Sequence, residues 1–157
     1  MSHFFPVVSE KGQRAKMSLT YQQEQFLHAA TGRAAILDLD ARHNRAYSDG
    51  DRDGWIGTFR HSGASYTRDG DLFTDLRAAF DGGDGQRLVT LDHEISIDGV
   101  NGTQRCVVVL FAAMYGDTTL RATGTYRDTL TYERGGWYFT SRVLKWDSVP
   151  SRHPLVM

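Results

Sequence analysis

The spacing of the apolar residues changes once along this chain, near residue 86, and this change constrains the fold more than any other feature of the sequence. Between residues 20 and 80, apolar side chains recur every three or four positions, which is the period of one helix face. From residue 87 onward they recur at every second position, which is the period of one strand face. Helices followed by a run of strands predict an α+β domain, with the helices packed on one face of an antiparallel sheet.

Four helical segments are expected before the change. A short helix precedes Gly32, and the stretch RAAILDLDARHNRAYS after it indicates a long amphipathic helix that ends at Gly50. Asp53 is placed to cap a third, short helix, and residues 71–80 predict a last one. The residues ASYT between these two helices are expected to form a brief strand.

Four long strands are expected after the change, and short turns at DGVNG, YGD and ERGG separate them. Gly135 and Gly136 accept the positive φ that a tight hairpin turn requires. Because each strand follows the previous one through a short turn, we expect an antiparallel meander. The predicted strands are RLVTLDHEISID, TQRCVVVLFAAMY, TTLRATGTYRDTLTYE and WYFTSRVLKWDS.

The length of the chain, 157 residues with 40% hydrophobic content, suits one domain with a single core. We place that domain at residues 20–148. Residues 1–19, which contain a proline, a glycine and scattered charges, are expected to form an N-terminal arm. Residues 149–157 are expected to form a C-terminal tail, in which His153 either closes a pocket or lies on the surface.

The charge balance and the single cysteine argue against several classes of function. A formal net charge of −1 provides no basic surface for nucleic acid or an anionic membrane, so neither partner is expected. Cys106 lies in the apolar run CVVVLFAAM and is expected to be a buried core thiol, without an internal disulfide or a cysteine-ligated metal. No apolar run approaches the roughly 20 residues of a membrane span, so we expect a soluble, cytoplasmic protein.

The stretch DGDRDGWIGTFR at residues 49–60 resembles the start of a calcium-binding loop. Its aspartates occupy positions 1, 3 and 5 of an EF-hand, and Gly54 occupies position 6. Position 12, where a bidentate glutamate completes such a site, is Arg60, and a guanidinium there repels the ion. We therefore expect no metal here and interpret Asp51 and Asp53 as helix caps.

Three phrases of the sequence together resemble the SnoaL-like branch of the NTF2-like superfamily. They are HNRAYSDGDRDGWIGTF, ISIDG and GTYRDTLTYERGGWYFTSR, and the resemblance spans residues 20–146. It implies a cone in which a strongly bent antiparallel sheet wraps around helices and leaves an apolar pocket. It also implies either a cofactor-free enzyme or a binding protein without chemistry, because the family contains both.

The resemblance further implies a catalytic dyad, in which a strand histidine abstracts a proton and an aspartate at the end of the long helix orients it. Matching the phrases places these two roles at Ser48 and Leu88, so both dyad residues are replaced in this chain. His93 lies five residues beyond Leu88, and a β-bulge would re-aim it. The dyad is therefore either absent or displaced.

Asp128 is the most unusual residue of the predicted strands, because it lies in an apolar row that includes Tyr126. In a dry cavity its pKa would rise, making it a general acid or base, while Tyr126 holds a substrate oxygen. Alternatively, Asp128 bonds to Arg142 or Arg105 on a neighbouring strand.

Two stripes of the long helix hold further candidates. Asp40, Asn44 and Ser48 share one stripe, for which a solvent-facing position is the simpler interpretation. His43 lies on a mostly apolar stripe and is either a buried, hydrogen-bonded side chain or a catalytic base. The residues expected to line the ligand pocket are Tyr47, Ser48, Trp55, Phe59 and Leu88.

Two functions remain open at this point. One is proton-transfer chemistry, such as isomerisation, dehydration or cyclisation, on a small apolar oxygenated ring compound, carried by Asp128 and Tyr126 with help from His43 or His93. The other is ligand binding or an accessory role without catalysis. On the opposite strand face, Arg105 and Arg127 belong to a polar row that faces either solvent or a second subunit, and we favour a homodimer through the outer sheet face.

Overall fold

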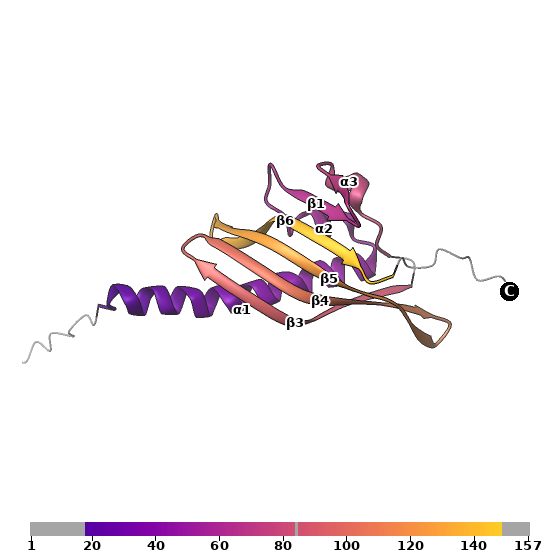
Figure 1. The fold of residues 1–157 in the computed structure, drawn as a ribbon, viewed down its shortest axis with the longest axis horizontal. Coiled ribbons are helices and arrows are strands. Elements are labelled where there is room, and N and C mark those ends of the chain that lie inside the picture. The colour runs from indigo at the N-terminus through magenta and orange to yellow at the C-terminus, as the bar shows by residue number, and fades with distance from the viewer. Residues whose placement is uncertain (1–17, 84, 149–157) are drawn as a thin grey trace, which may run out of the picture.

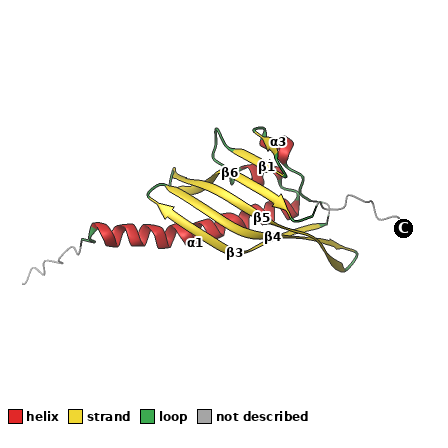
Figure 2. Cartoon of the chain, viewed as in Figure 1, coloured by secondary structure: helices red, strands yellow, loops and turns green. Residues whose placement is uncertain are grey.

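A computed structural model describes residues 18–83 and 85–148 of the chain and confirms the α+β class (Figures 1 and 2). One long helix lies against a curved sheet, and the smaller elements gather at one end of it (Figure 1). In chain order the elements are α1 (Tyr21–Asp49), α2 (Arg52–Ile56), β1 (Ser65–Arg68), β2 (Asp71–Phe73), α3 (Leu76–Ala79), β3 (Gln86–Asp98), β4 (Asn101–Met114), β5 (Asp117–Glu133) and β6 (Gly136–Trp146).

The six strands form one sheet in the order β2-β1-β6-β5-β4-β3. The predicted meander is confirmed, because β3, β4, β5 and β6 pair with one another in antiparallel fashion. The brief strand β1 was predicted, but its place in the sheet was not. It pairs in parallel with β6, where Tyr66 lies opposite Arg142.

The prediction of two helices around Gly32 is wrong, because α1 runs without a break from Tyr21 to Asp49. Gly32 is buried within this helix, and a Cβ atom there would lie 2.6 Å from Ile97 and 3.1 Å from Trp137. Packing against β3 and β6 therefore outweighs the helix-breaking tendency of glycine, about 1 kcal/mol relative to alanine. The predicted end is confirmed, since Gly50 terminates the helix with a φ of 70°.

The helix predicted over residues 71–80 is mostly a strand and a turn. A tight turn at Asp69 and Gly70, with φ values of 48° and 88°, reverses the chain so that Phe73 pairs with Tyr66 as part of a hairpin. Only Leu76–Ala79 is helical. Asp51, rather than Asp53, is the N-cap of α2 and accepts a hydrogen bond from the Gly54 amide.

The core lies between α1 and the inner face of the sheet. Cys106 is buried there, as predicted, and burial raises the pKa of its thiol to about 12. Across the described residues, no helix combines the length and the apolar character needed to cross a membrane. The predicted arm and tail, including His153, fall almost entirely outside the described residues.

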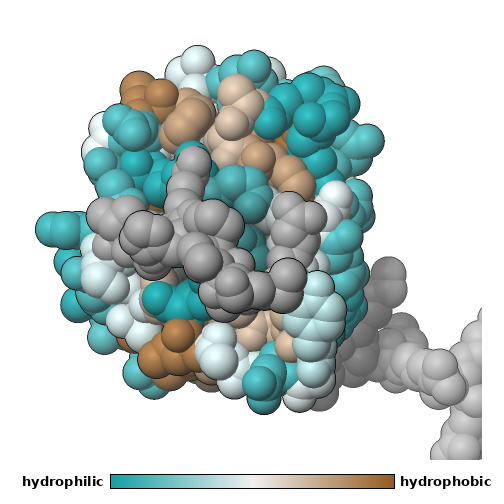
Figure 3. All heavy atoms as spheres, turned by 90° about the vertical axis from the view of Figure 1, so that its right-hand side faces the viewer, coloured by the Kyte–Doolittle hydropathy of each residue, from teal (hydrophilic) through white to brown (hydrophobic). Residues whose placement is uncertain are grey.

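Hydrophilic residues predominate over the visible part of the end face at the right of Figure 1, with separate hydrophobic groups among them (Figure 3). The opposite end differs, because there the first turns of α1 extend beyond the edge of the sheet (Figure 1). Exposed apolar side chains occur along this extension at Tyr21, Phe26 and Leu27. The side chains that occupy the core lie on the part of α1 that the sheet covers, from Ile36 to Tyr47.

Replacing Gly124 with alanine should destabilise the protein, because β6 passes too close to β5 to admit a side chain at this position. A Cβ atom would lie 2.6 Å from the Lys145 carbonyl oxygen and 3.1 Å from the Trp146 Cα, both of which are backbone atoms. We expect Gly124→Ala to lower the free energy of unfolding by about 1–3 kcal/mol in urea denaturation. Gly136→Ala is the matched control, since its nearest neighbour would be 3.5 Å away; equal losses in the two variants would contradict the explanation.

Candidate functional site

A β-bulge in β3 turns His93 toward the helix. Leu91 pairs with Val107 and Glu94 pairs with Arg105, so two residues of β3, Asp92 and His93, oppose the single residue between those partners on β4. Asp92 adopts a φ of 55° at this irregularity. Continuing the alternation from Leu88 would direct residue 93 outward. The bulge instead directs His93 inward, which is the outcome considered from the sequence for a β-bulge at this histidine.

His93 meets Asp40, a buried residue in the middle of α1. The Nδ1 atom of His93 lies 3.3 Å from Asp40 Oδ2 and 2.9 Å from Gln104 Oε1. Both partners are hydrogen-bond acceptors, so Nδ1 carries a proton that it donates to them. Proton exchange with a substrate or with solvent is therefore left to Nε2, the other ring nitrogen.

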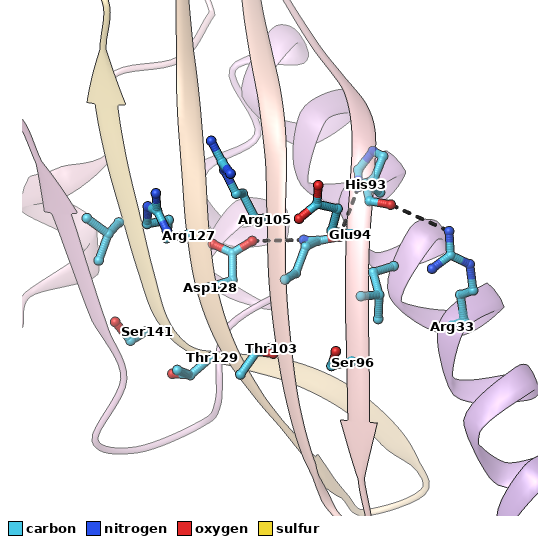
Figure 4. A pocket seen from close by; sticks show the side chains of 13 residues that line it. Arg33, His93, Glu94, Ser96, Thr103, Arg105, Arg127, Asp128, Thr129 and Ser141 are labelled. Carbon is cyan, nitrogen blue, oxygen red and sulfur yellow. Dashed lines mark hydrogen bonds between the residues drawn. The ribbon is translucent and has the colours of Figure 1, made fainter.

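Gln104 and Arg142 extend this contact into a buried polar network, defined here as Asp40, His93, Gln104, Asp128 and Arg142. The Gln104 amide nitrogen donates to Asp40 at 3.1 Å and to Asp128 at 2.8 Å, the latter drawn in Figure 4. Arg142 donates to Asp40 at 3.1 Å, and its Nε lies 3.2 Å from Asp128 Oδ1. Five polar residues from α1, β3, β4, β5 and β6 thus form one cluster, in which Gln104 is the uncharged member.

The charges of the network shift the pKa values of its members in ways that follow from burial and pairing. Burial raises the pKa of Asp128 to about 6, although the Arg142 charge and the Gln104 hydrogen bond oppose this rise. The hydrogen bond to Asp40 raises the pKa of His93 against the opposing effect of burial. When His93 is protonated, two carboxylates face two cations, which balances the charge inside the protein.

The Arg142 side chain is fully buried between aromatic rings. Its guanidinium carbon lies 3.6 Å from the ring centre of Tyr126 and 4.2 Å from that of Phe139. Such contacts favour a flat, weakly hydrated cation. Although burial acts against its charge, the neighbouring carboxylates of Asp128 and Asp40 raise the pKa of Arg142 further. Of the two partners foreseen for Asp128, the structure therefore selects Arg142 and not Arg105.

His43 occupies a second polar position in the core. The Thr58 hydroxyl donates its only proton to the Trp55 carbonyl oxygen at 2.6 Å, so it must accept from His43 Nδ1, 2.9 Å away. His43 is therefore a neutral ring with its lone pair on Nε2, an atom that has no hydrogen-bond partner among the described residues. Burial, followed by the charge of Arg142, lowers the pKa of His43 well below its usual value.

The stripe of Asp40, Asn44 and Ser48 does not face solvent, contrary to the simpler interpretation. Asn44 donates to the Thr90 hydroxyl at 2.9 Å, and Ser48 accepts from the Leu88 amide at 3.0 Å. All three residues therefore contact β3. Ser48 and Leu88, the positions matched to the dyad, do meet each other. An aspartate and a histidine meet two helical turns earlier along α1.

The predicted site residues fall into two neighbouring groups. His93 and Asp128 are joined through Gln104, while His43 and Tyr126 lie with ring centres 6.2 Å apart. The expected pocket residues Tyr47, Trp55, Phe59 and Leu88 are buried in the core, and Ser48 is half-buried.

Asp40 and Gln104 were not among the predicted site residues. Asp40 belongs to the stripe that was interpreted as solvent-facing. The position of Asp40 on the long helix could have identified it. If a bulge turns His93 toward this helix, the imidazole requires a polar partner on the helix face that it meets.

Within the described parts of the chain, no three histidine, cysteine, aspartate or glutamate side chains gather where they could share a metal ion.

Comparison with known proteins identifies the family. The sequence profile of the SnoaL-like domain matches residues 28–143. The chain belongs to the SnoaL-like family. No curated protein matches the sequence of this SnoaL-like chain.

Solved structures share the fold of this SnoaL-like domain. An NTF2-like protein with a cystatin-like fold from Novosphingobium aromaticivorans has a TM-score of 0.73 and 19% identity, covering 86% of this chain and 94% of that one. A candidate scytalone dehydratase from the same organism has a TM-score of 0.66 and 14% identity, covering 82% and 95%. A protein of unknown function from Mycobacterium tuberculosis has a TM-score of 0.69 and 24% identity, covering 84% and 79%.

The buried His43 and the half-buried His93 of this SnoaL-like domain should titrate in opposite directions from the ordinary pKa of 6.5. By NMR, we expect His93 to titrate above that value and His43 well below it. Asp40→Asn should lower the pKa of His93, because the hydrogen bond to the carboxylate is its largest stabilising cause. Asp38→Asn, on the exposed side of the same helix, is the matched control and should leave the titration unchanged.

The same shifts predict how stability depends on pH. Because the folded-state pKa of His93 is raised, the stability that it contributes is fully present below the unfolded pKa of about 6.5 and disappears as pH rises through the folded value. His43 has the opposite sign, since its neutral form is favoured in the fold and stability falls as pH drops below about 6.5. Urea denaturation of His93→Gln and wild type across pH would contradict this if their difference did not shrink at high pH.

Proposed function

We propose that this protein is a cofactor-free enzyme that transfers protons on a small, apolar, oxygenated ring compound, by isomerisation, dehydration or cyclisation. The observation that supports it is the contact between His93 and Asp40, in which a strand histidine is oriented by a buried helix carboxylate. This is the type of pair that the family resemblance implies, displaced from the positions first matched to it.

In this proposal His93 is the general base, because its environment prepares it for proton abstraction. Asp40 and Gln104 hold the Nδ1 proton, which directs the lone pair to Nε2 and fixes the plane of the ring. When Nε2 takes a proton from the substrate, the positive charge of the imidazolium forms beside the Asp40 carboxylate. The raised pKa of His93 reflects the same stabilisation.

The other predicted catalytic residues have supporting roles in this proposal. Asp128, with a pKa of about 6, helps to position Gln104 and Arg142, which its two oxygens face. These contacts make Asp128 less available to a substrate than His93 is. His43 provides an unpaired acceptor atom and Tyr126 a phenol, and we propose that these two groups bind oxygen atoms of the substrate. The lining of that substrate site by Tyr47, Ser48, Trp55, Phe59 and Leu88 stays a prediction.

Substitution of His93 should remove catalysis without unfolding the protein. In a screen of hydroxylated and keto ring compounds that detects proton exchange and product formation, we expect His93→Gln to lower kcat by about 10²–10⁴-fold. Asp40→Asn should lower kcat and shift its pH profile toward acid, because the pKa of the base falls. His28→Gln is the matched control, since His28 lies outside the network and contacts Tyr132 and Trp137.

The assay separates His93 from Asp128 as the proton-transferring group. Full activity in His93→Gln together with inactivity in Asp128→Asn would transfer the role of base to Asp128. If no compound turned over while ring compounds still bound, the enzymatic proposal would be wrong.

A second candidate function is binding of a small apolar ligand without catalysis. The observation that favours it concerns Ser48 and Leu88, which occupy the two positions matched to the dyad. The Leu88 amide donates a hydrogen bond to the Ser48 hydroxyl. A hydroxyl group in this position orients no imidazole. Saturable binding of ring compounds, with no turnover in wild type and no effect of His93→Gln, would favour this candidate. Its predicted location in the cytoplasm stays a prediction under either function.

We also propose that the protein forms a homodimer through the outer face of the sheet. Apolar side chains occupy one part of that face, where Val89 pairs with Val109 and Leu91 with Val107 across β3 and β4. The exposed fractions of Val89 and Leu91 are 43% and 40%, so both apolar side chains are accessible to a second subunit. An exposed antiparallel face of this kind suits an isologous contact, in which the same patch of both copies meets.

A charge placed in this apolar group should prevent dimer formation. We expect wild type to sediment as a dimer and Leu91→Lys as a monomer, because burying an unpaired ammonium group is costly. Leu72→Lys is the matched control, since Leu72 is also an exposed leucine, at 65%, but lies on β2 at the other edge of the sheet. A monomeric wild type would contradict the proposal.

A further inference from the structure

Two polar rows cross the outer face of the sheet, on the side opposite α1. In the first row, Glu94 on β3 lies opposite Arg105 on β4, which in turn lies opposite Arg127 on β5. In the second row, Thr103 on β4 lies between Ser96 and Thr129 on the neighbouring strands. The first row is called the charged row and the second the hydroxyl row. The apolar group of Val89, Leu91, Val107 and Val109 lies beside the charged row on the same face. Along β3 it comes before Glu94 and Ser96, so it includes no residue of either row.

These rows line a hollow of about 780 Å³ in the outer face. Figure 4 shows Arg105 and Arg127 side by side on adjacent strands, with the hydroxyl groups of Thr103 and Thr129 farther along the same strands. Arg33 reaches the rim of the hollow, where it donates to the His93 carbonyl oxygen at 3.5 Å. The hollow is therefore bounded by cations and hydroxyl groups.

Arg105 and Arg127 repel each other, and no carboxylate of the described residues forms an ion pair with either of them. Like charges directly opposite each other in a sheet destabilise it. Glu94, across from Arg105, provides one negative charge against the three positive charges of Arg33, Arg105 and Arg127. Asp128 lies beneath the hollow, but Arg142 neutralises it from the core. The hollow thus carries an excess of positive charge.

We propose that this hollow binds a small organic anion whose phosphate, sulfate or carboxylate group lies between Arg105 and Arg127. Guanidinium groups donate paired hydrogen bonds to such oxygens, and the hydroxyl row supplies further donors. The volume lies within the range of pockets that hold small organic ligands, which leaves room for an organic part beyond the anionic group. His93, Gln104 and Asp128 of the polar network also line the hollow, but none of the three arginines acts in the proposed proton transfer.

Calorimetric titration with phenyl phosphate and with inorganic phosphate, at matched ionic strength, tests the proposal. We expect saturable binding of phenyl phosphate to the wild-type protein, tighter than that of inorganic phosphate because the ring contacts the remainder of the hollow. Arg105→Gln and Arg127→Gln should each weaken binding about tenfold, the effect of losing one charge-assisted hydrogen bond. Glu94→Gln should have the opposite effect and tighten binding, because it removes the carboxylate from the charged row.

Arg52→Gln is the matched control, because it removes the same charge from an exposed position at the start of α2. It should leave the affinity unchanged. Equal weakening in Arg52→Gln and Arg127→Gln would mean that only the overall charge attracts the anion, and would overturn the proposal. Absence of saturable binding would also overturn it.

Sedimentation of the same variants distinguishes the anion from a second copy of the chain. If Arg105→Gln changed the oligomeric state and no anion bound to wild type, the charged row would contact another subunit and the proposal would be wrong. Turnover assays are not part of this test, so failure of the proton-transfer proposal would leave its outcome unaffected.

Discussion

The interior of this protein is organised by the contact between Asp40 and Arg142, two opposite charges that are both withdrawn from water. One belongs to the long helix and the other to β6, so their attraction joins the helix to the sheet across the core. Neither charge would be tolerated there alone, since an unpaired buried charge costs several kcal/mol. His93, Gln104 and Asp128 complete the balance, and the position of α1 on the sheet therefore depends on polar contacts as well as on apolar packing.

The two histidines of the core illustrate how neighbours determine chemistry. In His43, burial and then the charge of Arg142 lower the pKa, whereas in His93 the hydrogen bond to Asp40 raises it. The difference follows mainly from complete burial at His43 and from the carboxylate partner at His93. This protein thus holds two histidines with opposite pKa shifts, and the proposed function uses both.

Much of the fold follows from local patterns, whereas the site depends on contacts that no local pattern encodes. The change of apolar spacing correctly separates α1 from the four long strands, because periodicity reflects which face of an element is buried. The break expected at Gly32 fails, since Ile97 and Trp137 are distant in sequence and their packing requires a residue without a side chain. Asp40 was missed for the same reason, because its partners His93, Gln104 and Arg142 lie on three different strands. Asp128 and His93 could be identified as candidates from the sequence. Arg142 was one of two partners considered for Asp128, whereas the partners of His93 became known only from the structure.

The bulge at Asp92 has a consequence for how β3 as a whole is arranged. Before it, even-numbered residues such as Leu88 point toward the core; after it, odd-numbered residues such as Ile95 and Ile97 do so. The strand therefore has two registers of side chains joined by one extra residue. Deleting Asp92 would therefore reverse the direction of every side chain in one half of β3, so that residues now facing the core would face solvent. The half from His93 to Asp98 and the half from Gln86 to Leu91 are consistent with each other only because Asp92 lies between them.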